Sequence, residues 1–216
     1  MTGKRLKVMV SSTVYGNEEL LELVYTILTQ TGKYEVWMSH KGTMPVFSSQ
    51  SAFENCLNAV EKCDAILGFI TPYYGSGKNE DRDNLSITHQ ELVKAIDLDK
   101  PRWILVHDHV VFARSLLKYL NYEKKEDRRN LSLKQNKVLD DLRVIDMYEY
   151  AIRDIDEIPL MEKKGNWVQK YQSDDDALLF AISQFSRFQE VKEFVEKNCN
   201  NVDAIIEKIT RKRGKS

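Results

Sequence analysis

A single carboxyl group and several hydroxyl groups stand at positions where this chain could carry out chemistry. Glu91 lies near the start of a predicted helix and is the carboxylate offered by the segments that we expect to meet there. A carboxylate can stabilise a cationic transition state or trap it covalently. Hydroxyl, N–H and aromatic groups beside it could hold a sugar, a phosphate or a base, and the candidates are Ser11, Ser12, Thr13, Tyr15, Tyr73, Tyr74, Ser86 and Thr88.

The elements that must position these residues alternate between strand and helix in the first half of the chain. Apolar runs predict strands at Leu6–Val10, Tyr34–Met38, Ala65–Ile70 and Trp103–Val106, and apolar residues at helical spacing predict helices between them. The continuous apolar run Ala65–Ile70 is typical of a strand buried on both faces of a parallel sheet. Strand–helix–strand repetition with short connections predicts an α/β fold with a doubly wound, mostly parallel sheet.

The ends of these strands define the expected site. In doubly wound sheets, ligands bind beyond the carboxyl ends of the strands, where loops and helix N-termini meet. Three segments should converge there, namely Ser11–Gly16 after the first strand, Thr71–Gly77 after the third strand, and the start of the helix Ile87–Leu98. We therefore expect one cleft that contains Glu91.

Structural roles compete with functional ones for these residues. Thr88 and Glu91 fit a capping box, in which Glu91 would only bond the backbone at the helix start. If Ser86 is the cap instead, Glu91 lies deeper in the helix and is free to face the cleft. Likewise, Ser11–Thr13 could be a turn whose hydroxyls satisfy the backbone, and the two neighbouring tyrosines could be packing residues. The residues alone leave these alternatives open.

The second half of the chain is less regular. We predict that residues 111–216 form a mainly helical extension, which packs on an α/β domain of residues 1–110. The expected helices are Val110–Leu120, Leu133–Leu142 and Asp174–Asn198, the last capped by Ser173, and the expected strands are Val144–Ile152 and Trp167–Tyr171. The mixed charge run Glu123–Arg129 is typical of a solvated loop or helix face.

Composition argues against several classes of partner. The 32 basic and 33 acidic residues nearly cancel, so no global charge favours a nucleic-acid or membrane partner. The apolar runs are too short for a signal-peptide core or a membrane span. The cysteines, Cys56, Cys63 and Cys199, include no CxxC pair, which predicts reduced thiols, no zinc site and a cytoplasmic protein.

Signatures of other enzyme classes are absent from the sequence. It contains no G-x-x-x-x-G-K-[ST] loop, no G-x-G-x-x-G after the first strand and no G-x-S-x-G elbow, which argues against P-loop ATPases, conventional dinucleotide redox enzymes and elbow-type hydrolases. His89 is predicted to face solvent. His107 and His109 flank Asp108 but are expected to give two metal ligands at most, so we predict no metal site and no bound cofactor.

Three motifs, in order along the chain, resemble those of one family. They are V-x-V-S-S-T-x-Y (Val8–Tyr15), C-D-A-I-L-G-F-I-x-x-x-Y-G (Cys63–Gly75) and S-I-T-x-x-E-x-x-x-A (Ser86–Ala95). Together they look like the domain of unknown function forty-sixty-two, a TIR-like domain related in fold to TIR domains and nucleoside deoxyribosyltransferases. The resemblance covers roughly residues 5–107 and implies a flavodoxin-like, three-layer α/β fold.

The same resemblance implies a reaction. The relatives use a glutamate at the start of the corresponding helix, so Glu91 would be the catalytic glutamate and NAD the first candidate substrate. The nicotinamide of NAD is already cationic, so its departure when the N-glycosidic bond breaks needs no general acid, and one carboxylate suffices for the oxocarbenium-like state. The resemblance also implies an effector or signal-maker in bacterial antiphage immunity, acting as a homo-oligomer or with a partner effector protein.

Other functions stay beside this one. The cleft could sense a nucleotide without turnover, or the domain could be an interaction scaffold that binds no ligand. A deoxyribosyltransferase would need a second carboxylate near Glu91. Asp83 is the nearest acidic residue before the helix, but its spacing departs from the pattern of that family.

Overall fold

Five strands form one parallel sheet in the computed structural model, which describes residues 5–75, 78–79, 85–131, 133–134, 138–152 and 167–198. The strands are β1 Leu6–Ser11, β2 Tyr34–Trp37, β3 Ala65–Ile70, β6 Arg102–His107 and β7 Val168–Tyr171. Their order in the sheet is β2-β1-β3-β6-β7, and every neighbouring pair is parallel. This is the doubly wound, flavodoxin-like strand order, so the predicted fold class is confirmed.

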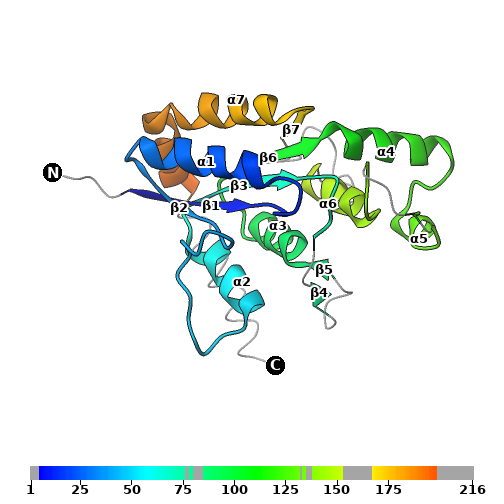
Figure 1. Ribbon diagram of the computed structural model, residues 1–216, viewed down its shortest axis with the longest axis horizontal. Coiled ribbons are helices and arrows are strands. Elements are labelled where there is room, and N and C mark those ends of the chain that lie inside the picture. Colours follow the sequence, from blue (N-terminus) through cyan, green and yellow to red (C-terminus); the bar gives the residue numbers. More distant parts are fainter. Residues whose placement is uncertain are drawn as a thin grey trace.

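Helices cover both faces of this sheet and give a three-layer arrangement (Figure 1). On one face, α1 (Glu18–Gln30) and α7 (Asp174–Phe185) share a core with β1 and β3. The other face is covered by α2 (Ala52–Lys62), α3 (Ile87–Asp97) and α6 (Arg143–Ile152). The remaining described elements are α4 Asp108–Tyr119, the short α5 Lys125–Arg128, and the antiparallel pair β4 Lys78–Asn79 and β5 Leu85–Ser86.

The central strands are apolar because helices cover both of their faces. All residues of β3 are buried, and at Gly68 a Cβ would lie 2.8 Å from Cδ1 of Ile104, so a larger residue would require that side chain to shift. At the start of α2, Ser51 and Glu54 form the predicted capping box. The strands and helices predicted up to residue 107 are therefore confirmed, with ends that differ by one or two residues.

Three predictions for the second half of the chain are wrong. Val144–Ile152 lies in helix α6 instead of a strand, because its apolar residues recur at helical spacing and fill the core beside β6. The described residues between 133 and 142 contain no helix. The helix expected at Asp174–Asn198 is broken into α7 and a second helix at residues 188–198, a break that lets both Phe185 and Val191 reach the core around α1.

Three other predictions for this half are confirmed, and the first is the helix expected at Val110–Leu120, which is α4. The strand expected at Trp167–Tyr171 is β7, which pairs with β6 at the edge of the sheet. Ser173 caps α7, because its hydroxyl accepts the backbone N–H of Asp176 and the Asp176 carboxylate accepts the backbone N–H of Ser173. The second half of the chain therefore completes both the sheet and one helical layer.

The charge run Glu123–Arg129 was predicted to be a solvated loop or helix face, but part of it is buried. Arg128, at the end of α5, is buried, and its guanidinium donates hydrogen bonds to the carboxylates of Asp146 and Glu149 on α6. A buried charge of this kind persists only where it is paired and hydrogen-bonded. The ion pairs therefore attach α5 to α6.

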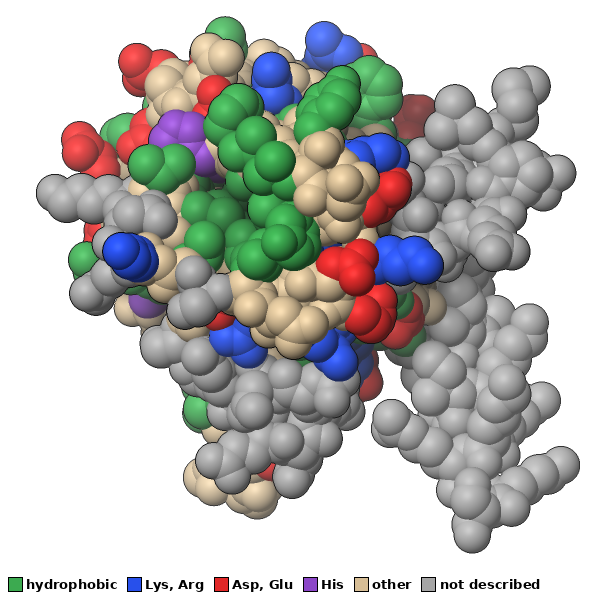
Figure 2. All heavy atoms as spheres, turned by 90° about the vertical axis from the view of Figure 1, so that its right-hand side faces the viewer, with side chains coloured by type: hydrophobic (Ala, Val, Ile, Leu, Met, Phe, Trp, Pro, Cys, Tyr) green, Lys and Arg blue, Asp and Glu red, His purple; other side chains and the backbone are tan. Residues whose placement is uncertain are grey.

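α4 presents an apolar face to solvent. Val110 is the only buried residue of this helix, whereas Phe112, Leu116 and Tyr119 are exposed. Figure 2, which views the molecule from the side on which α4 lies, shows hydrophobic side chains gathered on this face. None of the described helices combines the length and the apolar character needed to cross a membrane.

Candidate functional site

A pocket opens at the point of the sheet where the winding direction of the chain reverses. It lies beyond the carboxyl ends of β1 and β3, neighbouring strands whose following helices, α1 and α3, cover opposite faces of the sheet. Its volume is about 150 Å³. Its polar lining comes from the loops after β1 and β2 and from the start of α3, and consists of Ser12, Thr13, Tyr15, Ser39, His40, Thr88 and Glu91.

The way in which α3 begins frees the Glu91 side chain. The Ser86 hydroxyl accepts the backbone N–H of His89 at 3.3 Å and so caps the helix, which settles the alternative that the sequence left open. Glu91 is therefore not part of a capping box. Its carboxylate instead accepts a hydrogen bond of 2.5 Å from Oγ of Ser11 at the end of β1, and another from the thiol of Cys56 on α2.

Burial sets the acidity of Glu91. The residue is 5% exposed, and this burial raises the pKa of its carboxyl from 4.5 to about 7, although the hydrogen bonds from Ser11 and Cys56 favour the charged form and lower the pKa. Burial and the nearby carboxylate raise the pKa of the Cys56 thiol to about 12, so this thiol stays protonated and can donate. Near neutral pH, Glu91 therefore passes between its protonated and its ionised form.

The loop after β1 forms one wall of the pocket. Asn17 holds this loop by donating from Nδ2 to the carbonyl oxygens of Thr13 and Tyr15, both at 3.1 Å, and its side chain does not cap α1. Gly75, from the loop after β3, has a φ of +85°, and a Cβ on it would lie 3.0 Å from Oγ1 of Thr13. The loops that follow β1 and β3 therefore meet at this edge of the sheet.

The structure brings some of the predicted site residues to the pocket and leaves others outside it. Glu91 lines the pocket together with Ser12, Thr13, Tyr15 and Thr88, and Ser11 contacts the Glu91 carboxylate. Tyr73, Tyr74 and Ser86 do not line it. Sequence reasoning missed Ser39 and His40, although their position directly after β2 was a signal that could have indicated them.

The two tyrosines after β3 have packing roles. Tyr74 is 1% exposed, and its hydroxyl lies 2.8 Å from Nδ1 of His89 and accepts the backbone N–H of Ser86 at 3.2 Å. Tyr73 packs edge-on against Tyr15, with the ring centroids 5.6 Å apart. The prediction that His89 faces solvent is wrong, because it is buried beside Tyr74; burial lowers the pKa of its imidazole to about 3, so the ring is neutral at pH 7.

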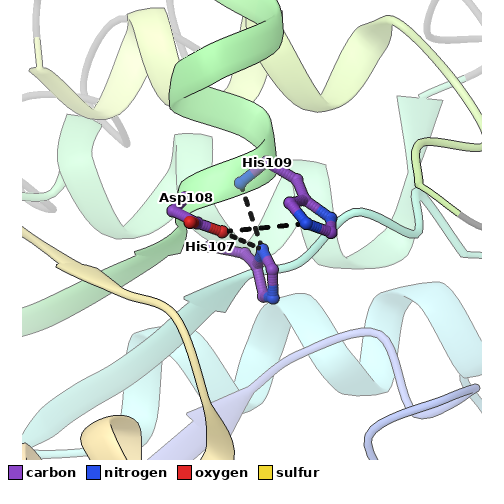
Figure 3. Close-up of side chains that lie close together, drawn as sticks. All are labelled: His107, Asp108 and His109. Carbon is purple, nitrogen blue, oxygen red and sulfur yellow. Dashed lines mark hydrogen bonds and ion pairs between the residues drawn. The ribbon is translucent and has the colours of Figure 1, made fainter.

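A second group of polar side chains lies at the carboxyl end of β6 (Figure 3). His107, Asp108 and His109 each offer one ligand atom, and these atoms all lie within 4.8 Å of one another. Oδ1 of Asp108 is 3.1 Å from Nδ1 of His107 and 4.0 Å from Nε2 of His109. The three side chains therefore lie closer together than the prediction of two ligands at most assumed. That prediction assumed strand geometry, whereas α4 begins at Asp108 and turns the third side chain into the group.

The model of one family matches the chain. The family is described as a domain of unknown function (DUF4062), and the match covers residues 7–213, well beyond the segment that contains the three motifs. No curated protein matches the chain.

Proposed function

Since the chain belongs to the DUF4062 family, whose description leaves its chemistry open, we propose, from the site together with the TIR-like resemblance of the three motifs, that the protein cleaves the N-glycosidic bond of NAD or a related nucleotide. The observation that carries this proposal is the buried Glu91 carboxyl, held by Ser11 and lining a hydroxyl-bearing pocket where the sheet reverses its winding. A TIR-like relationship is part of the same proposal.

Glu91 would act as the catalytic residue. As the bond between ribose C1′ and the nicotinamide nitrogen breaks, its electron pair leaves with the nicotinamide, which departs as a neutral ring. The positive charge then falls on the ribose, where the carboxylate stabilises it or bonds covalently to C1′ before water completes the hydrolysis. Ser12 and Thr13, on the wall of the pocket, are placed to hold ribose or phosphate oxygens.

The protonation state of Glu91 sets the pH dependence of this reaction. Only the carboxylate stabilises a cation, and its pKa of about 7 means that the active form becomes more populated as the pH rises through neutrality. The activity of the free enzyme should therefore increase with pH in this range. A nicotinamide cation bound beside the carboxyl favours the ionised form and lowers its pKa.

A nucleotide-sensing module is the second candidate, because a pocket this small encloses only part of a dinucleotide and binding there does not require turnover. Pockets that enclose drug-sized ligands measure roughly 300–1,000 Å³, whereas this pocket measures about 150 Å³. It can enclose the reacting end of a nucleotide but not a whole dinucleotide. In this alternative, a homo-oligomer or a partner effector protein responds to the bound state. Under either candidate, the protein acts in the cytoplasm, in antiphage defence.

Release of nicotinamide from NAD tests the catalytic proposal in wild-type protein, Glu91→Gln and Glu193→Gln. Glu193 is an exposed carboxylate on the helix at residues 188–198, and it is the matched control for the loss of one negative charge. We expect the rate to fall by about 100-fold or more in Glu91→Gln, as for loss of a group that stabilises transition-state charge, and to stay unchanged in Glu193→Gln.

Equal rates in wild type and Glu91→Gln would refute the role of this carboxyl. The assay should be repeated over a range of protein concentrations, because the proposal includes a homo-oligomer. A thermal-shift measurement with NAD separates the two candidates. Stabilisation by NAD without release of nicotinamide at any concentration would favour sensing.

A further inference from the structure

The three side chains at the start of α4 have the chemical types and the spacing of a metal site. Figure 3 shows His107, Asp108 and His109 turned toward one another. Ligand atoms bonded at 2.0–2.1 Å to a tetrahedral zinc ion lie about 3.4 Å from one another. The two distances from Oδ1 of Asp108, 3.1 Å and 4.0 Å, lie on either side of this value. All three ligand atoms lie within 4.8 Å of one another, so rotation of the side chains would be needed to bring the whole group to coordination distance.

Nδ1 of His107 is placed against two groups at once. It accepts the backbone N–H of His109 at 3.2 Å and also lies 3.1 Å from the carboxylate oxygen of Asp108. A neutral imidazole nitrogen of this kind has one lone pair, and a carboxylate oxygen beside it is repelled unless a proton or a metal ion lies between them. A metal ion at this position would take the lone pair of Nδ1 in place of the His109 N–H, and Nε2 of His109 would add a second nitrogen donor.

Acidic side chains surround this group, and a buried hydroxyl without a hydrogen-bond partner among the described residues lies near it. Asp174, at the start of α7, interacts electrostatically with His107, and Glu19 and Asp175 interact in the same way with Asp174. The ring of Tyr171 contacts that of His107, with centroids 5.1 Å apart, and its buried hydroxyl has no hydrogen-bond partner in the part of the chain that the structure describes. Such an orphaned group is uncommon and often marks the place of a water molecule or an ion.

We propose that His107, Asp108 and His109 bind one divalent transition-metal ion of the zinc type. Two imidazole nitrogens and one carboxylate suit such ions better than Mg²⁺ or Ca²⁺, which prefer oxygen ligands. Three protein ligands leave a coordination position for water or for a ligand group. The site shares no residue with the Glu91 pocket, so this inference goes beyond the proposed reaction and does not depend on it.

Equilibrium dialysis of the full chain against micromolar Zn²⁺ at neutral pH, followed by elemental analysis, tests the proposal. We expect one Zn²⁺ per chain in the wild type and at least tenfold weaker binding in Asp108→Asn and in His109→Ala. His40→Ala is the matched control, because His40 is exposed and lies outside the group; it should bind Zn²⁺ as the wild type does. Excess Mg²⁺ should not displace the ion.

The choice of variants keeps the test decisive. His107 also caps α4, so His107→Ala could unfold the helix, whereas the His109 side chain is 45% exposed and can be removed with little effect on folding. Thermal melting adds an independent readout, because Zn²⁺ should raise the melting temperature of the wild type and of His40→Ala but not that of His109→Ala. Wild-type protein that retains no Zn²⁺, or undiminished binding in both Asp108→Asn and His109→Ala, would overturn the proposal.

Discussion

Replacing Glu91 by glutamine should make the folded protein more stable above neutral pH. Burial raises the pKa of this carboxyl from 4.5 to about 7, so keeping it ionised in the folded state costs free energy. Each pKa unit corresponds to about 1.4 kcal/mol, which gives a cost of about 3 kcal/mol at high pH. Glutamine removes the charge and can still accept the hydrogen bond from Ser11. We expect Glu91→Gln to exceed wild type by up to about 3 kcal/mol at pH 8.

The sign of the pH dependence follows from proton binding. Because the pKa of Glu91 is higher in the folded than in the unfolded chain, the folded state binds more protons between about pH 4.5 and pH 7. The free energy of unfolding of the wild type should therefore fall as the pH rises through this window and level off above it. His89 contributes with the opposite sign, since its lowered pKa removes stability as the pH falls below 6.5. That contribution is present in both proteins and cancels in their difference.

Urea unfolding of wild type, Glu91→Gln and Glu193→Gln at pH 4.5, 6 and 8 measures this difference. The gap between Glu91→Gln and wild type should widen with pH, whereas Glu193→Gln should follow the wild type throughout. If the difference in free energy of unfolding between Glu91→Gln and wild type stays constant from pH 4.5 to pH 8, burial does not raise the pKa of Glu91 in the folded protein.

Three further substitutions test the geometry around the pocket. Ser11→Ala removes a hydrogen bond that favours the charged form of Glu91, so the midpoint of the pH–rate profile should move to higher pH; an unmoved midpoint would contradict the contact. Gly75→Ala should lower the free energy of unfolding in urea by about 1–2 kcal/mol because of the positive φ, and further because the new Cβ would crowd Thr13. Gly42→Ala is the control, because Gly42 also has a positive φ but has no neighbour within 4 Å of the new Cβ. Equal losses in the two variants would argue against the close approach of the two loops. Tyr74→Phe leaves a buried ring nitrogen and a backbone N–H without their partner and should cost about 1–3 kcal/mol; a loss below about 0.5 kcal/mol would place that hydroxyl elsewhere.

Local patterns in the sequence were sufficient for the sheet and for the first three long helices. The six residues of Ala65–Ile70 are all apolar or glycine because the strand is covered on both faces, and this composition is visible without any tertiary information. The capping box of Ser51 and Glu54 is likewise a short-range signal. Neighbouring parallel strands end at the same edge of the sheet, and Glu91 lies near the start of α3, which also begins at that edge. The loop after β1 could therefore be predicted to lie close to Glu91.

Contacts between distant segments could not be predicted in the same way. Val144–Ile152 is rich in β-branched and aromatic residues, which are typical of strands. It forms a helix because this conformation packs its apolar residues into the core beside β6. The thiol of Cys56 reaches the carboxylate of Glu91 only because α2 packs on α3. No pattern in the sequence predicts that Tyr74 points into the core and contacts His89.

The carboxyl of Glu91 is enclosed by groups from β1, α2 and α3, so its affinity for a proton reports how closely those elements fit together. A ligand that brings water or a positive charge beside it must drive part of that proton into the solvent. By thermodynamic reciprocity, raising the pH must then tighten the binding of that ligand by the same coupling free energy. Occupancy of the pocket is thus linked to the acidity of the surrounding medium, whether or not a bond is broken there.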